Sequence, residues 1–294
     1  MSAPLLSDTE FEHLAAQARQ LVQQRQTRGA GHFAGPHITT QRGPGLELQD
    51  LRAYQYGDEV RHIAWRASAR SSRPLVKVFH AERRQRRLIW LDQHPGMAFA
   101  TRGELKAARA LRASALIGFA ALQQQAEIGA IVSNNTDHFF PFSGRLHQWL
   151  RLLGVANQTP ELKQQTTTPQ LQLQHLDRLA TRDTELLLIS DFQHWDDSLQ
   201  TAIAPLAAKC KVTALQIIDR GELDLPDAGK VRLISPFNGN THVIDSSNPQ
   251  LRRRYRELME QRQNNTSSLL KRNNIQHTLL YTDDNTLPVI NQLL

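Results

Sequence analysis

The segment Glu185-Leu-Leu-Leu-Ile-Ser-Asp191 is an apolar run of strand length that ends in an aspartate. A second run, Arg87-Leu-Ile-Trp-Leu-Asp92, has the same character and the same ending. Short runs that are hydrophobic at nearly every position are typical of strands buried on both faces of a parallel sheet. The two segments therefore predict two buried strands of a parallel sheet, each ending in an aspartate.

Strand and helix patterns alternate around these two segments, from Leu88 to the C-terminus. This alternation predicts a mostly parallel sheet with helices on both faces, and right-handed crossovers make it a doubly wound α/β domain. Further strands are expected over 128–133, 138–142, 211–218 and 276–281, and a hairpin over 231–235 and 241–245 around Asn238-Gly239. Helices are expected over 104–125, 146–153, 169–179, 196–209, 249–272 and 287–294.

The first 86 residues do not alternate in this way. Ser7 to Arg28 has apolar residues at helical spacing behind the capping candidates Ser7 and Asp8, and Pro74 to His80 has the pattern of a strand. We therefore expect residues 1–86 to form an N-terminal lobe, a helix plus a small β element, and residues 87–294 to form the α/β domain.

The stretch from Gly43 to Arg73 alternates charges of both signs among aromatic and aliphatic residues, with turn signals at Gly43-Pro-Gly45 and Gly57-Asp58. Arginine and aromatic side chains dominate the energetic centres of protein interfaces, whereas Arg–carboxylate pairs mainly fix geometry. Two interpretations remain open, a partner-binding surface or a set of side chains that lock the lobe onto the main domain. Locking is favoured for Trp65 and Asp58. The candidate residues are Arg52, Tyr54, Asp58, Arg61, Trp65 and Arg70.

The formal net charge of +7 is concentrated in two basic clusters, Arg83–Arg87 and Arg252–Arg256. Neither accompanies a recognised nucleic-acid motif, so a nucleic-acid-associated protein, even a nuclease, is the alternative function, acting through the first cluster. The N-terminus lacks a signal-peptide pattern, and no apolar run reaches the roughly 18 residues of a membrane span. We expect a cytoplasmic protein, with its one cysteine, Cys210, buried and unpaired.

Enzyme signatures are missing from the sequence. It has no Gly-x-Ser-x-Gly elbow, no Walker A run and no dinucleotide-binding glycine pattern after the Asp92 strand. A nuclease-type site of Asp50, Asp58, Glu59 and Glu82 with Lys77 is disfavoured because arginines among them would neutralise the carboxylates. We therefore expect a protein without enzymatic activity and without a cofactor.

A longer pattern carries a resemblance. The run G-x-G-L-E-L-x-D-L-R-x-Y-x-x-G-D-x-V-R-x-I-x-W-x-A-S-A-R over 43–70, followed by P-L-V-K-V-F-x-A-E-R over 74–83, resembles the signature of a bacterial family named domain of unknown function 58. Members resemble von Willebrand factor A domains and are usually encoded beside a MoxR-type AAA+ ATPase. The resemblance implies an adaptor or scaffold that acts with this ATPase on a client protein.

The von Willebrand A resemblance also implies a magnesium site. In such domains the first strand ends in Asp-x-Ser-x-Ser, and a later strand supplies a second aspartate. Here Asp92 and Asp191 match the aspartates, but His94 and Gly96 stand at the serine positions, and histidine is a poor magnesium ligand. We therefore expect a degenerate metal site.

Ser143 or Thr136 could supply the loop hydroxyl of this magnesium site. In the structural alternative no metal ion binds, and Asp92 and Asp191 only accept hydrogen bonds from the backbone of the following turn. His32 and His37 lie in a glycine-containing loop without further ligands at a recognisable spacing, so we expect them near solvent rather than on a metal ion.

Overall fold

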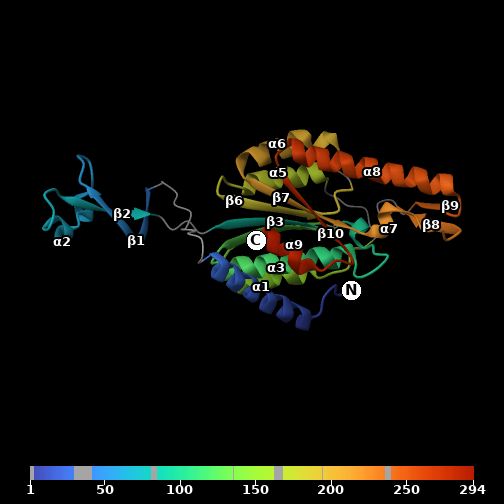
Figure 1. Ribbon diagram of the computed structural model, residues 1–294, viewed down its shortest axis with the longest axis horizontal. Coiled ribbons are helices and arrows are strands. Elements are labelled where there is room, and N and C mark those ends of the chain that lie inside the picture. The colour runs from blue at the N-terminus through green and yellow to red at the C-terminus, as the bar shows by residue number, and fades with distance from the viewer. Residues whose placement is uncertain are drawn as a thin grey trace. The chain divides into compact units, whose positions relative to one another are not determined.

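The computed structural model describes residues 3–29, 42–80, 85–134, 136–161, 168–193, 195–235 and 240–294, with side chains for all of these except 28–29, 42–50 and 78–80 (Figure 1). The chain forms two compact units. Unit 1 comprises residues 1–25 and 85–294, and unit 2 comprises residues 26–84.

Unit 1 is built on a six-stranded sheet of order β10-β7-β6-β3-β4-β5. Neighbouring strands are parallel except for β5, which pairs antiparallel with β4 at one edge. Numbered in chain order, the strands run 3-2-1-4-5-6, the classical doubly wound arrangement, so the predicted fold class is confirmed. The strands are β3 (Arg86–Asp92), β4 (Glu127–Ser133), β5 (Asp137–Ser143), β6 (Thr184–Ser190), β7 (Lys211–Ile218) and β10 (Gln276–Tyr281).

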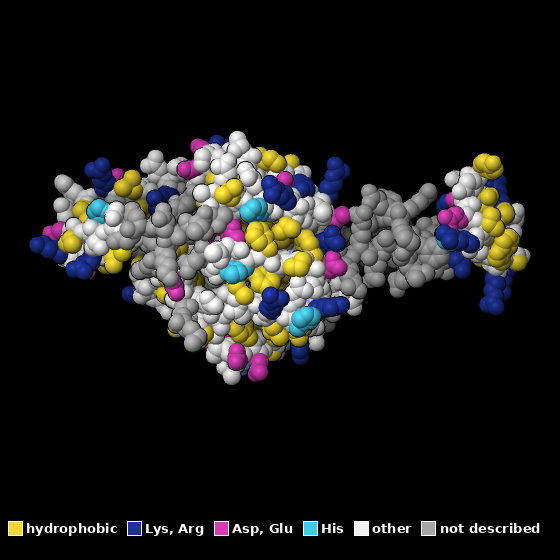
Figure 2. Space-filling model, turned by 180° about the vertical axis from the view of Figure 1, so that it is seen from behind, with side chains coloured by type: hydrophobic (Ala, Val, Ile, Leu, Met, Phe, Trp, Pro, Cys, Tyr) yellow, Lys and Arg dark blue, Asp and Glu magenta, His cyan; other side chains and the backbone are white. Residues whose placement is uncertain are grey.

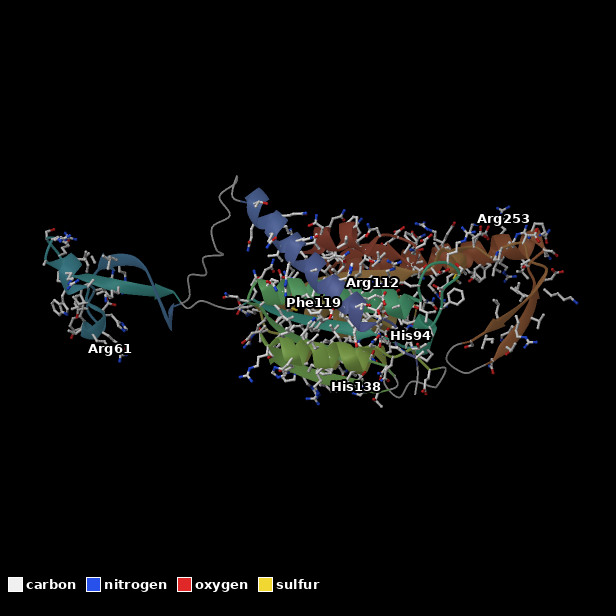
Figure 3. The ribbon with its side chains drawn as sticks, turned by 90° about the horizontal axis from the view of Figure 1, so that it is seen from below. Arg61, His94, Arg112, Phe119, His138 and Arg253 are labelled. Carbon is white, nitrogen blue, oxygen red and sulfur yellow. The ribbon has the colours of Figure 1, made fainter. Side chains whose placement is uncertain are left out.

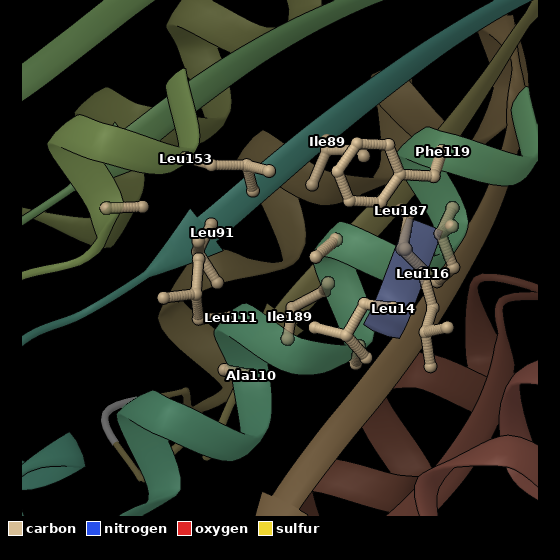
Figure 4. Close-up of a cluster of buried hydrophobic side chains, with 14 of the residues drawn as sticks. Leu14, Ile89, Leu91, Ala110, Leu111, Leu116, Phe119, Leu153, Leu187 and Ile189 are labelled. Carbon is tan, nitrogen blue, oxygen red and sulfur yellow. The ribbon is translucent and has the colours of Figure 1, made fainter. Parts of the chain in front are cut away.

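Helices cover both faces of this sheet (Figure 1). Successive side chains of β3 point to opposite faces, so Ile89 and Leu91 enter one apolar core (Figure 4), and Leu88 and Trp90 enter the other. The first core lies under α1 (Asp8–Gly29), α3 (Lys106–Gln123), α4 (Leu146–Ala156) and α9 (Thr286–Leu293). The second lies under α5 (Pro169–Leu179), α6 (Gln200–Lys209) and α8 (Pro249–Arg272).

The N-terminal helix belongs to unit 1. Leu14, Ala18 and Val22 of α1 are buried in the same core as α3, and Arg112 of α3 pairs with Glu10. The expected boundary after residue 86 had placed this helix in the N-terminal lobe. The structure differs because burying the apolar stripe of α1 on the α/β core removes that surface from water, which a small two-stranded lobe could not do.

Unit 2 consists of the antiparallel strands β1 (Arg42–Ala53) and β2 (Leu75–His80), joined by η1 (Val60–His62) and α2 (Trp65–Ser68). The Gly43–Gly45 segment, predicted as a turn, lies instead inside β1, where a register shift between Arg42 and Glu47 accommodates it as a β-bulge-like irregularity. The turn predicted at Gly57 is present, and this glycine has φ +102°.

The remaining elements of unit 1 are short. They are η2 (Pro95–Met97), η3 (Asp197–Leu199), α7 (Arg220–Leu223), and the strands β8 (Lys230–Ile234) and β9 (Thr241–Asp245). β8 and β9 pair antiparallel as the predicted hairpin, whose Asn238-Gly239 turn lies outside the described residues. Among the described helices, none has the length and apolar composition needed to cross a bilayer.

Candidate functional site

The topology brings the two strand-end aspartates to one edge of the sheet. β3 and β6 are parallel neighbours in the middle of the sheet. After β3 the chain continues to β4, toward one edge of the sheet, and after β6 it continues to β7, toward the other edge. Such a switch point at the carboxyl ends of the strands is where doubly wound domains bind ligands. Asp92 ends β3 and Asp191 follows β6.

Asp92 is buried and accepts two hydrogen bonds. Ser190 Oγ donates to it at 2.6 Å and the backbone N–H of His94 at 3.1 Å. Burial raises the pKa of Asp92, an effect that His94 and the hydrogen bond from Ser190 partly oppose. Asp92 thus has the backbone contact that the structural alternative predicted, together with a hydroxyl from the neighbouring strand.

Asp191 is buried and lies at the centre of a group of charges. Lys106 Nζ donates to its Oδ2 at 2.7 Å, and His94 Nε2 lies 2.9 Å from its Oδ1. The backbone N–H of Gln193 donates to Oδ1 at 3.0 Å. Burial would raise the pKa of Asp191, but His94 and Lys106 outweigh it and hold that pKa well below its usual range. Asp191 is therefore a carboxylate held between a lysine and a histidine.

His94 lies in the turn after β3 (Figure 3) and is held from both ring nitrogens. The backbone N–H of Gly96 donates to Nδ1 at 2.9 Å, and Nε2 faces Asp191. Burial lowers the pKa of His94, but the Asp191 and Asp92 carboxylates outweigh it and raise this pKa to about 9. The two carboxylates thus favour the imidazolium, whereas the hydrogen bond from Gly96 requires an unprotonated Nδ1.

Lys106 is the first residue of α3, and its side chain is completely buried. Its Nζ donates to Asp191 and, at 2.6 Å, to Glu222 Oε1 on α7. Burial lowers the pKa of Lys106, but Asp191 and Glu222 outweigh it and raise this pKa. Burial raises the pKa of Glu222, which Lys106 opposes. We call Asp92, His94, Lys106, Asp191 and Glu222 the ion cluster.

A third strand-end aspartate, Asp219 after β7, holds Glu222 in position. It caps α7 by accepting from the backbone N–H of Gly221 at 2.8 Å, and Thr101 and Thr282 donate to it from other segments. The sequence interpretation did not single out Asp219, although the strand predicted over 211–218 leads directly into it. Lys106 and Glu222 were also missed, because neither is near the aspartates in the sequence.

The ion cluster does not fit a magnesium ion. The oxygens that would face such an ion, on Asp191 and Glu222, already accept hydrogen bonds from Lys106. The candidate hydroxyls bond within their own loops, Ser143 with the backbone N–H of Arg145 and Thr136 with His138. Over the described ranges, no set of three or more His, Cys, Asp or Glu side chains is arranged to hold a metal ion.

The structure brings together only some of the candidate residues of unit 2. Arg52 donates to both oxygens of Asp58, at 2.7 and 2.5 Å, and the backbone N–H of Gln55 donates to Asp58 at 2.8 Å. Arg52 and Asp58 therefore fix the turn within unit 2. The other four do not join this group: Tyr54 is half-buried, Arg61 pairs with the neighbouring Glu59, and Arg70 and the Trp65 side chain, which is 65% exposed, face solvent.

The arginines behind the nucleic-acid alternative are largely used within the fold. Arg86 pairs with Glu127, and Arg87 is buried against Glu185. Arg83 and Arg84, like His32 and His37, lie outside the described residues. In the second cluster, three arginines form ion pairs with carboxylates of unit 1: Arg252 with Asp227, Arg253 with Glu257 and Arg256 with Asp224.

The nuclease-type set does not assemble around Lys77 in the described part of the chain. Asp58 and Glu59 are paired with Arg52 and Arg61. The side chain of Asp50 and the whole of Glu82 lie outside what the structure describes. The described carboxylates of this set are thus neutralised by arginines, in the manner that the sequence suggested.

Comparison with known proteins places the chain in a family. A family model described as "Protein of unknown function DUF58" matches residues 50–265. The uncharacterized proteins Mb1516 of Mycobacterium bovis and Rv1480 of Mycobacterium tuberculosis are each 28% identical over 240 residues, 80% of this chain and 74% of theirs. The conserved hypothetical protein BatB from Bacteroides thetaiotaomicron is similar with a TM-score of 0.45 and 16% identity, over 70% of this chain and 95% of that one. Because the family model spans more than half of the sequence, this chain belongs to the DUF58 family.

Proposed function

We propose that this protein is a non-enzymatic adaptor or scaffold that acts with a MoxR-type AAA+ ATPase in the remodelling or maturation of a client protein. The observation that carries the proposal is the exposed apolar surface of unit 2. Trp65 is 65% exposed, Val60 is 60% exposed and Tyr56 is fully exposed. Figure 2 shows hydrophobic side chains beside those of lysine and arginine on this unit.

This combination of residues suits protein binding. Tryptophan, tyrosine and arginine dominate the energetic centres of protein interfaces. The aromatic rings contribute because each buries a large apolar area. Arg61 and Arg66 are exposed in the same segment as Trp65. The segment also lies within the part of the chain that matches the family model. We therefore assign partner recognition to unit 2.

The backbone that carries these side chains is fixed by polar contacts. The Arg52–Asp58 pair and the Gln55 hydrogen bond close the turn, and the hydroxyl of Ser68 accepts from the backbone N–H of Leu75 at 2.9 Å, tying α2 to β2. A binding surface that is ordered before the partner arrives loses less conformational entropy on binding. These contacts support a preformed recognition surface.

The ion cluster supports a role without catalysis at the usual ligand-binding edge of unit 1. Each of its carboxylates is matched by a cation or a hydrogen-bond donor, and the cluster is buried apart from the partly exposed Glu222. A substrate would have to break these contacts to reach the strand ends. In the proposal, the nucleotide chemistry is supplied by the ATPase, and this chain provides recognition.

The test is a binding titration with the MoxR-type ATPase encoded nearest to the gene, with and without ATP. We expect association that Trp65→Ala weakens at least about 30-fold, the effect of losing an interface hot spot. The matched control is Phe139→Ala, which removes an aromatic ring that is 51% exposed on unit 1. The proposal fails if the folded proteins do not associate in either nucleotide state, or if Trp65→Ala and Phe139→Ala bind alike.

A further inference from the structure

We infer that the Lys106 ammonium takes the place of a divalent metal ion in the ion cluster. A domain of this fold could hold such an ion at the carboxyl ends of its strands, whereas here the cation is a side chain of the protein. The ion cluster therefore needs no metal ion. A consequence that rests on the proposed function is that partner binding by this chain needs no divalent ion in the ion cluster.

The first argument is geometric. Lys106 Nζ bridges oxygens from two different elements, Asp191 Oδ2 at 2.7 Å and Glu222 Oε1 at 2.6 Å. Both distances are those of charge-assisted hydrogen bonds. Glu222 Oε1 also accepts from the Gln193 side chain at 2.9 Å. The ammonium therefore occupies the point on which the two carboxylates converge.

The second argument concerns where Lys106 lies in its helix. It is the first residue of α3, and the N-terminal end of a helix carries a partial positive charge that disfavours cations. Its complete burial adds a desolvation cost. Neither helix formation nor packing accounts for a buried lysine at this position. The two carboxylates do account for it, so the position of Lys106 is explained by a requirement for positive charge at this point.

The third argument is charge balance. The ion cluster brings together three carboxyl groups, on Asp92, Asp191 and Glu222, and the Lys106 ammonium pairs with two of them. Removing Lys106 takes one positive charge away from Asp191 and Glu222. A divalent ion could supply positive charge at the same point. Buried charges left without partners are strongly destabilising, so removing the lysine creates a requirement that a divalent ion can meet.

The fourth argument concerns space. A cavity of about 40 Å³ adjoins the ion cluster and is lined by Asp191, Gln193, Gln216, Glu222 and Arg262, among other residues. A volume of this size holds one or two water molecules, and hard divalent ions keep part of their water when bound to carboxylates. Shortening the lysine side chain would open further space beside the Asp191 and Glu222 oxygens that Lys106 Nζ now contacts.

The experiment is a titration of the full chain with Mn²⁺, followed by calorimetry and by thermal unfolding. We expect no saturable binding to the wild type, and binding of one ion per chain to Lys106→Ser. At ten times Kd the ion should raise the Tm of the variant by about 3–6 °C. Lys106→Ser combined with Asp191→Asn should lose this binding. Lys209→Ser is the matched control, because Lys209 pairs with Asp177 at the surface.

Two results would overturn the inference: saturable Mn²⁺ or Mg²⁺ binding by the wild type that Asp191→Asn removes, or a folded Lys106→Ser variant that binds no Mn²⁺. If Lys106→Ser does not fold, the wild type still provides a test by ¹⁵N NMR of its lysine ammonium groups. A buried, hydrogen-bonded ammonium should give a slowly exchanging signal that excess MgCl₂ leaves unchanged. Loss or displacement of that signal would contradict the inference.

The consequence for binding is tested separately. Association with the ATPase, measured without nucleotide, should be the same in EDTA and in Mg²⁺. A loss of association in EDTA by the Lys106→Ser variant alone would agree with the cation assignment, whereas a loss by the wild type would contradict its metal-independent role. If no association occurs at all, the proposed function fails, but the Mn²⁺ titration still decides the nature of the cation.

Discussion

The ion cluster of unit 1 and residues 52–70 of unit 2 both contain ion pairs, but the pairs of the ion cluster are buried and the Arg61–Glu59 pair of unit 2 is exposed. The Lys106 and Asp191 side chains are 0% and 2% exposed, whereas Arg61 and Glu59 are 76% and 56% exposed. Breaking one partner of a buried pair leaves an uncompensated charge in a poorly solvated place, while water replaces the lost partner at the surface. Charge pairing is therefore structural in the ion cluster and nearly neutral for stability in the exposed Arg61–Glu59 pair of unit 2.

The difference suggests how the two units divide their roles. In unit 1, charges fill the edge where doubly wound domains normally bind ligands. In unit 2, the exposed charged and aromatic side chains contribute little to the fold and are available for contact with another protein. The following predictions test this contrast, from the largest expected effect on stability to the smallest.

Asp191→Asn should have the largest effect. It removes the carboxylate that faces both Lys106 and His94 and leaves buried positive charge without compensation, so we expect a loss of about 3–5 kcal/mol in the free energy of unfolding of unit 1. Denaturant unfolding measures this loss. Asp197→Asn breaks a surface pair with Arg272 and should cost less than about 1 kcal/mol. Equal losses in the two variants would remove the contrast.

The second prediction concerns pH and His94. Its pKa is raised from 6.5 to about 9 in the folded protein, so the stability it contributes is fully present below pH 6.5 and is lost as the pH rises through 9. After allowance for the Gly96 hydrogen bond, the loss should be about 2 kcal/mol. The measurement is the free energy of unfolding across this range for the wild type minus that for His94→Gln. A difference that does not change with pH would show that the ring stays neutral.

The third prediction tests the polar contacts of unit 2. Asp58→Asn removes the carboxylate that accepts from the backbone of Gln55 and from Arg52, so the Gln55 amide should exchange with solvent roughly five- to tenfold faster. Hydrogen exchange followed by NMR gives this rate. Glu59→Gln, which breaks the pairs of Glu59 with Arg61 and His62 but leaves the Asp58 contacts in place, should leave the Gln55 rate unchanged. No effect in Asp58→Asn would mean that the turn does not depend on this carboxylate.

The smallest effect on stability is expected for Trp65→Ala. Because most of this side chain is exposed, its removal should change the free energy of unfolding by less than about 0.5 kcal/mol. Trp90→Ala is the control from unit 1, where the indole is buried and donates to Ser133 Oγ, and should cost about 3–5 kcal/mol. A large loss of stability in Trp65→Ala would instead assign Trp65 to the locking role considered from the sequence.

Much of the fold could be predicted from local patterns. The helix over 249–272 and the strand over 276–281 have the predicted bounds, because the periodicity of apolar residues is a local signal. The alternation of elements also predicted the doubly wound sheet. The attachment of α1 to unit 1 could not be predicted in this way, because an amphipathic stripe shows that a helix is buried but not against which partner.

The ion cluster was only half predicted. Asp92 and Asp191 were recognisable because each ends an apolar strand, and parallel neighbours place their carboxyl ends at one edge. Lys106 and Glu222 gave no comparable signal, since a lysine at the start of a helix is ordinarily a solvated charge. Their separation in the sequence means that only the packing of α3 and α7 over the strand ends joins them to Asp191.

The sequence by itself determined the elements of this protein, their alternation into a doubly wound sheet, its family, and the presence of His94 and Gly96 in the turn after Asp92. Those properties depend on short-range periodicity and on residue type at fixed spacing. Tertiary structure alone decided which cation faces the aspartates and which unit carries the first helix. Both depend on contacts between residues far apart in the chain. Burial strengthens the charge interactions that hold Lys106 beside Asp191, and apolar contact places the first helix on the core of unit 1.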